Sequence, residues 1–187
     1  MVGAPVMLQT IAYELSPSDG QVVALAEHHE NYANLCNRIA DIILSLSTDK
    51  KLVRLKVAQS AIDRDPSLNA VTERKFIVNP TRYRRLAVNR VFHDLGCDRG
   101  KRYTGDDFVD IDTSLATLKV NSLNQPFALT MDIKMFRTRT KVRLPVPCRY
   151  SEVTGSDWLP AGKAILVRNK NTWRVVVAVD IPDGDDE

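Results

Sequence analysis

Apolar and polar positions recur along the chain with two different periods, and these periods divide it into three parts. Residues 7–15, "MLQTIAYEL", alternate and carry aromatic and branched side chains, which is typical of a β-strand. Residues 16–99 repeat apolar positions every three or four residues, as helices do. From residue 100 onward, short branched or alternating runs are separated by Asn, Gly, Pro and Ser, which indicates an antiparallel sheet or barrel.

Helices are expected in the middle part. Ser16 as N-cap, Pro17 in the first turn and Asp19 in a capping-box arrangement predict the start of the first helix. Its apolar stripe comprises Val22, Ala26, His29, Ala33, Cys36, Ile39, Ile43 and Leu46, and we interpret His29 as a histidine at the edge of the core. A second helical pattern covers residues 50–65, and residues 69–80 fit either a short helix or an extended connector. The third helix, residues 81–96, has an apolar face of Tyr83, Leu86, Ala87, Val91 and Leu95 and ends at Gly96.

A lone first strand cannot bury itself, so we expect it to join the later sheet. The fold class is then α+β, an antiparallel β-barrel split by a helical insertion. The predicted division is residues 1–15 for the first strand, 16–99 for the insertion, 100–182 for the rest of the barrel and 183–187 for an acidic tail.

Length and composition are those of a folded chain, because 187 residues with 44% apolar content can bury a core. The three cysteines are far apart in the sequence, which argues against a disulfide framework or a zinc ribbon. The N-terminus has no basic leader, and no run of eighteen apolar residues occurs. These features predict a cytoplasmic protein that does not enter membranes.

The net charge of +3 understates how basic most of the chain is. The last eight residues hold five acids, and without them residues 1–179 carry 26 bases against 18 acids, a balance of +8. In "FRTRTKVRL", residues 136–144, strand geometry puts Arg137, Arg139, Lys141 and Arg143 on one face. Residues 134–149 contain six bases and no acid. A charged edge that prevents aggregation would explain some of these bases, but a polyanion ligand explains the absence of acids better.

A second basic region covers residues 74–102, where nine bases accompany only two aspartates. On the third helix, Arg82, Arg85 and Asn89 share one face. Arginine favours bidentate contacts with phosphate or guanine, and Tyr83 and Tyr103 could stack on bases. The alternative is an amphipathic helix whose basic face contacts only water.

Catalytic motifs are not evident. "GSDWLPAGKA" lacks the glycine spacing and the hydroxyl of a phosphate-binding loop. Asp106, Asp107, Asp110 and Asp112 form the one internal carboxylate cluster, which could hold a metal but is more simply a set of solvated acids. We therefore predict no metal site and no cofactor.

The order of these segments resembles a known family. A strand, then "LSPSDGQ" leading into a helix with "ANLCNRIADI", is similar to the start of the transposon-encoded TnpB nucleases and the related type V CRISPR effectors. Later, "RTKVRLPVPCRY" followed by "KAILVRNKNTWRVVVAVDIP" is similar to that family's run of strands. The resemblance covers most of the chain.

The resemblance implies a wedge domain, a β-barrel of the oligonucleotide-binding type, split by a helical recognition domain. Such a lobe binds guide RNA and reads a short motif beside the DNA target. The family's nuclease chemistry lies in a RuvC-like domain that begins after these strands. Asp180 in "VAVDIPDG" superficially matches its first acid, but no later acids complete a two-metal site, so we expect no catalytic residue here. Mg²⁺ is expected only with a RuvC partner chain.

The expected partners are therefore guide RNA, target DNA and a separate RuvC-containing chain. The predicted RNA-binding residues are Arg137, Arg139, Lys141, Arg143, Arg149, Lys101, Arg102 and Tyr103. The predicted DNA-binding residues are Arg82, Tyr83, Arg85, Asn89, Arg74 and Lys75. Two alternatives remain: a DNA-binding regulator that acts without RNA, and an interaction module that docks an acidic partner protein.

Overall fold

A computed structural model describes residues 6–49, 51–66, 68, 80–135, 141–147, 159–170 and 172–182. This part of the chain is α+β, with three helices and two antiparallel sheets. The helices are α1 (Asp19–Leu46), α2 (Leu55–Arg64) and α4 (Pro80–Cys97). The strands are β1 (Val6–Leu15), β2 (Val109–Asp112), β3 (Ala116–Val120), β4 (Leu129–Ile133), β5 (Val142–Val146), β6 (Leu159–Asn169) and β7 (Thr172–Pro182).

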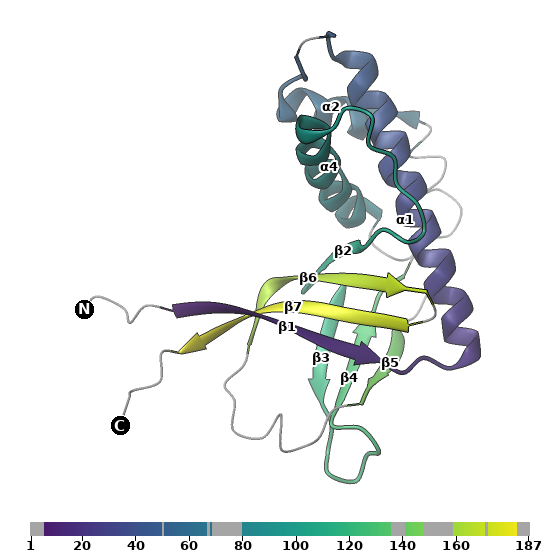
Figure 1. Cartoon of the computed structure of the whole chain (residues 1–187), viewed down its shortest axis with the longest axis vertical. Coiled ribbons are helices and arrows are strands. Elements are labelled where there is room, and N and C mark those ends of the chain that lie inside the picture. The colour runs from purple at the N-terminus through teal and green to yellow at the C-terminus, as the bar shows by residue number, and fades with distance from the viewer. Residues whose placement is uncertain are drawn as a thin grey trace.

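The first strand pairs with the last. β1 runs antiparallel to β7, from Val6 opposite Pro182 to Leu15 opposite Trp173. The prediction that the opening strand joins the later sheet is therefore confirmed. The helices come between β1 and β2 in the sequence, and Figure 1 shows them grouped at one side of the sheets.

Seven strands form the two sheets among the described residues. The first sheet has the order β1-β7-β6-β2 and the second the order β3-β4-β5. In Figure 1 the strands of one sheet run across those of the other. The strands bury alternate side chains: Trp173, Val175 and Val177 of β7, and Leu144 and Val146 of β5.

The described strands do not close into a barrel, since no ladder joins the two sheets in that part of the chain. The sheets nevertheless meet at two corners. At one corner the Ser16 N–H donates to the Pro145 carbonyl at 2.9 Å. At the other, β2 turns into β3, and the Leu115 N–H donates to the Asp112 carbonyl, also at 2.9 Å.

The predicted start of α1 is wrong by two residues. The N-cap is Ser18 and not Ser16, since α1 begins at Asp19, and the Ser16 N–H donates to the Pro145 carbonyl in the connection that precedes the helix. The Ser18 N–H donates to Oε1 of Gln21 at 2.9 Å, and Nε2 of Gln21 donates to the Arg143 carbonyl at 2.7 Å. The start of α1 is thereby attached to β5.

The helical periodicities are confirmed. In α1 the stripe is buried at His29, Ala33, Cys36, Ile39 and Ile43, whereas Leu46 at its end is exposed. In α4 the predicted positions Tyr83, Ala87, Val91 and Leu95 are buried, whereas Leu86 is half-buried and Val88, outside the predicted face, is buried as well. The second helix is shorter than expected, because Thr48 and Lys51 form an isolated bridge before α2 begins at Leu55. Residues 69–79 lie outside the described part of the chain.

Candidate nucleic-acid interface

The predicted row of cations is described at two of its four positions, Lys141 and Arg143. Arg137 and Arg139, together with Arg149, lie outside the described residues. Lys141 and Arg143 are exposed while Leu144 is buried, so the charged and apolar residues alternate here as the sequence predicts.

The charge of Arg143 is compensated, contrary to expectation. It lies opposite Asp132 of β4, and its Nε donates to Oδ1 of Asp132 at 3.0 Å. Lys119 of β3 approaches the other oxygen at 2.6 Å. Burial of Asp132 opposes ionisation, but the hydrogen bonds from Lys119 and Arg143 hold the pKa of this carboxyl below its ordinary value. The acid missing from residues 134–149 is supplied by the neighbouring strand.

Arg82 also has an internal carboxylate partner. Its guanidinium bonds to Asp112 of β2, while Oγ of Ser114 donates to the same carboxylate at 2.6 Å. Burial opposes the charge on Asp112, yet the hydrogen bonds from Ser114 and Arg82 lower the pKa of the carboxyl. Arg82 therefore links α4 to the first sheet, and only its half-exposed side remains available to a ligand.

The rest of the predicted α4 face is open. Arg85 and Asn89 are exposed one and two turns beyond Arg82. Among the described residues, no carboxylate forms an ion pair with Arg85. These two side chains fit the predicted contact surface best.

Tyr83 is not available for base stacking, which corrects the prediction. Its side chain is 0% exposed and meets the rings of His28 and Tyr32 edge-on, with centroids 5.2 Å and 6.0 Å away. Its hydroxyl donates to the Lys134 carbonyl at 2.5 Å, and burial raises the pKa of the phenol. Tyr83 therefore joins the helices to the second sheet from inside the core.

Tyr103 is likewise buried and cannot stack on a base. Its hydroxyl donates to Oδ2 of Asp94 at 2.9 Å. The neighbouring bases have acidic partners too, since Lys101 is 3.3 Å from Asp107 and Arg102 is 2.9 Å from Asp41. The pair formed by Arg102 is exposed on both sides, so water weakens it and Arg102 can exchange partners. Arg74 and Lys75 lie outside the described residues.

Among the described residues the most enclosed cation is Arg90, which no sequence pattern distinguishes from the other bases. It is 9% exposed, and its guanidinium carbon lies 3.7 Å from the centre of the Phe108 ring. It is also within 4 Å of three carboxylates, those of Asp94, Asp107 and Asp110. The cluster at 106–112, considered above as metal ligands or solvated acids, thus contains the partners of buried and half-buried bases. In the described residues no group of three or more acids, histidines or cysteines is arranged to hold a metal ion.

Two histidines lie under this cluster. Nδ1 of His29 is 3.0 Å from the Asp107 carbonyl, and His28 contacts the hydroxyl of Tyr83 at 3.2 Å. Both are 1% exposed, so His29 lies inside the core and not at its edge. Burial, with the neighbouring His29, lowers the pKa of His28 to about 3, and burial also lowers the pKa of His29. Both side chains are therefore neutral near pH 7.

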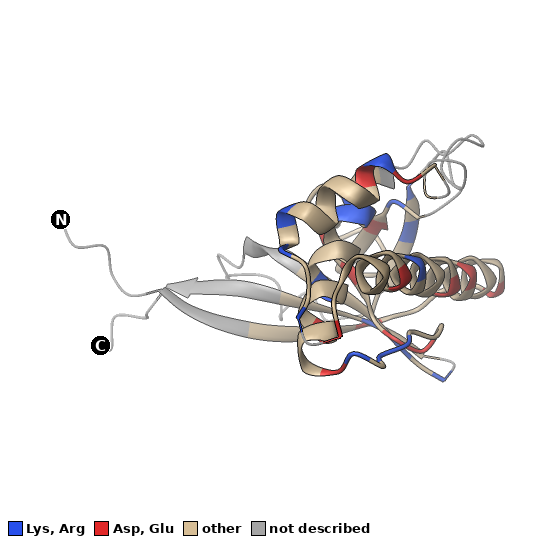
Figure 2. Ribbon diagram, turned by 90° about the horizontal axis from the view of Figure 1, so that it is seen from above, with Lys and Arg blue, Asp and Glu red and all other residues tan. Residues whose placement is uncertain are grey.

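A groove of about 550 Å³ lies between α4 and the first sheet. Asn89 lines it, but its charged lining residues are Arg90, Asp94 and Asp110, which gives more acid than base. Figure 2 shows Lys and Arg lying among Asp and Glu over the described helices rather than in one strip. Because acids outnumber bases in its lining, the groove does not attract phosphate. The exposed cations outside the groove are the candidates for contact with a polyanion.

No family model matches the chain, and no curated protein matches it. Among the described residues, no helix is long and apolar enough to cross a membrane.

Proposed function

We propose that this chain is the nucleic-acid-binding lobe of an RNA-guided DNA-targeting system. In this proposal it binds the scaffold of a guide RNA and the target DNA near a flanking motif. Base pairing by the RNA reads the target sequence, while the protein contacts the nucleic-acid backbone and recognises its shape. Cleavage is assigned to a RuvC domain outside this sequence, and Mg²⁺ to that domain.

The observation that carries the proposal is the split sheet. β1 is paired along its whole length with β7, although the helices and five strands come between them in the sequence. A wedge domain interrupted by a helical recognition domain requires this topology. The pairing of β1 with β7 is therefore the support for the proposal.

The finer proposal is that the two sheets act as one barrel-like wedge. Its support is the pair of corners, where Ser16 bonds to Pro145 and where β2 turns into β3. The first sheet has the order β1-β7-β6-β2 and the second the order β3-β4-β5. At one corner β2 leads into β3, and at the other β5 contacts β1. No strand ladder joins the two sheets among the described residues, and their action as one barrel is our proposal.

Several predicted contact residues form ion pairs with carboxylates of this chain, so fewer of them are proposed to bind nucleic acid. Arg85, Asn89 and Lys141 are exposed, and no described carboxylate pairs with Arg85 or Lys141. We assign Arg85 and Asn89 to DNA and Lys141 to RNA. Arg102 and Arg143 can contribute to RNA binding only by exchanging a carboxylate for a phosphate. Arg137, Arg139, Arg149, Arg74 and Lys75 remain predicted contacts.

The test is to purify the chain from cells that express its native neighbouring DNA and to sequence any RNA that accompanies it. We expect an absorbance ratio typical of a ribonucleoprotein and one discrete, structured RNA. Tight binding to duplex DNA by the RNA-free protein would indicate a regulator instead. A clean protein spectrum with a stable protein heterodimer would indicate an interaction module, and either result would contradict the proposal.

A further inference from the structure

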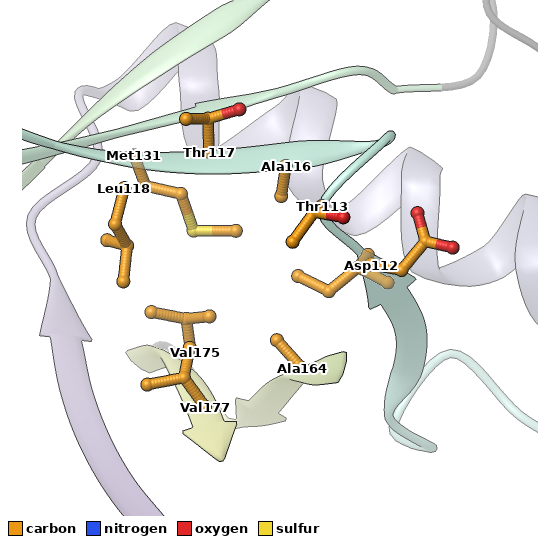
Figure 3. Close-up of a pocket in the computed structure, with 10 residues that line it drawn as sticks. Asp112, Thr113, Ala116, Thr117, Leu118, Met131, Ala164, Val175 and Val177 are labelled. Carbon is orange, nitrogen blue, oxygen red and sulfur yellow. The ribbon is translucent and has the colours of Figure 1, made fainter. Parts of the chain in front are cut away.

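A cavity of about 180 Å³ lies between the two sheets, close to the turn from β2 to β3 (Figure 3). Val175 and Val177 of β7 line it from the first sheet, and Leu118 and Met131 line it from the second. Ala116 and Ala164 also face it. With two alanines at this position, the side chains of the two sheets do not fill the space between them.

The atoms that face the inside of the cavity are mainly carbon atoms (Figure 3). Asp112, Thr113 and Thr117 line its rim, but Figure 3 shows the Asp112 carboxylate and the two threonine hydroxyls pointing away from the space. The Asp112 carboxylate already accepts hydrogen bonds from Arg82 and Ser114. An ordered water needs two to four polar partners, so water is a poor occupant of this cavity.

An apolar occupant fits on both size and chemistry. A cavity of roughly 150 Å³ lined by aliphatic and aromatic side chains is large enough to bind benzene, and this one is slightly larger. Unfilled volume between sheets forfeits the dispersion contacts of the side chains around it. A ring-sized molecule would restore those contacts without leaving a polar group unpaired.

We propose that this cavity is a binding site for one small, uncharged, apolar molecule of about the size of a single aromatic ring. The site does not depend on the proposed nucleic-acid function. Its ligand contacts the inner faces of both sheets, so binding stabilises their packing against each other.

Toluene is the probe, and methionine methyl groups report its position. The chain has four methionines, so ¹³C-methyl labelling gives a simple spectrum. Met131 lines the cavity, whereas Met135, although buried, does not. We expect the Met131 signal to shift saturably and the Met135 signal to move much less. We also expect the melting temperature to rise by about 3–6 °C at about ten times the Kd.

The matched variants are Ala164→Leu, which fills the cavity, and Ala12→Leu, which adds the same atoms at an exposed position of β1. Ala164→Leu should abolish the toluene response, and Ala12→Leu should keep it. If Ala164→Leu fails to fold, Ala116→Leu fills the same space from the second sheet. An unmoved Met131 signal, equal shifts of all the methionines, or a response that survives filling would overturn the proposal.

Discussion

At the scale of single residues, the arginines divide into those that hold the fold together and those that face solvent. Arg90 is enclosed by Phe108 and three carboxylates, whereas Arg85 is exposed on the same helix with no described carboxylate partner. Both are arginines of α4, so composition does not distinguish their roles. The difference arises partly from residues on another element, since Asp107 lies just before β2 and Asp110 within it, while Asp94 is one turn away on α4.

Replacing Arg90 tests this division. Arg90→Met should lower the free energy of unfolding by about 2–3 kcal/mol, because it leaves the half-buried carboxylates of Asp94, Asp107 and Asp110 without their cation. The control is Arg85→Met on the same helix, which should change stability by less than about 0.5 kcal/mol. Urea denaturation of both variants measures the effect. Equal losses would show that Arg90 is no more structural than Arg85.

The buried histidines predict how stability depends on pH. The folded protein keeps His28 neutral down to about pH 3, whereas the unfolded chain binds a proton below about 6.5. Stability is therefore complete above pH 6.5 and falls as the pH drops toward 3. The expected slope is about 1.4 kcal/mol per pH unit for this proton, with a contribution of the same sign from His29.

The matched variants are His28→Phe and His93→Phe. Urea midpoints between pH 7 and pH 5 should depend less steeply on pH in His28→Phe than in the wild type. His93 is exposed, so His93→Phe should keep the wild-type slope. A wild-type protein whose stability does not change over this range would contradict the buried, neutral state of His28.

At the scale of elements, the sequence predicts most of the architecture, because amphipathic periods depend only on local spacing. The faces of α1 and α4 and the alternation in β5 follow directly from it. The signal for the cap of α1 is present in the sequence, since Ser18 and Gln21 have the spacing of a capping box. Ser16 competes for the same role by sequence, and in the structure it lies beside Pro145, two residues before the cap.

The pairing of β1 with β7 can be tested by cross-linking. Ala12 lies opposite Val176 in the register. In a background with Cys97→Ser and Cys148→Ser, Ala12→Cys with Val176→Cys should form a disulfide on mild oxidation. Ala12→Cys with Val175→Cys should not, because neighbouring residues of a strand point to opposite faces. Preferential cross-linking of the second pair would show that the register is wrong by one residue.

At the scale of the whole molecule, the net positive charge overstates the cationic surface that a ligand can reach. Asp132 pairs with Lys119 and Arg143, and Asp112 pairs with Arg82, although the carboxylates are 11 and 30 residues from these arginines. A sequence window therefore counts cations that the fold neutralises. Among the predicted contact residues, a smaller set therefore remains for a polyanion, with Arg85 and Lys141 as its described cations.

The salt dependence of RNA and DNA binding tests the central claim most directly. The double variant Arg85→Glu/Lys141→Glu removes two proposed phosphate contacts, and Lys56→Glu on the exposed side of α2 is the matched charge control. Binding of the co-purified RNA and its target duplex is measured by fluorescence anisotropy from 50 to 200 mM salt, a range suited to such slopes. We predict that the slope of log K against log salt falls by about 0.7–1 for each of the two nucleic acids in the double variant, one contact in each, and hardly changes in Lys56→Glu. Equal slopes in all three proteins would contradict the claim that these cations hold nucleic acid.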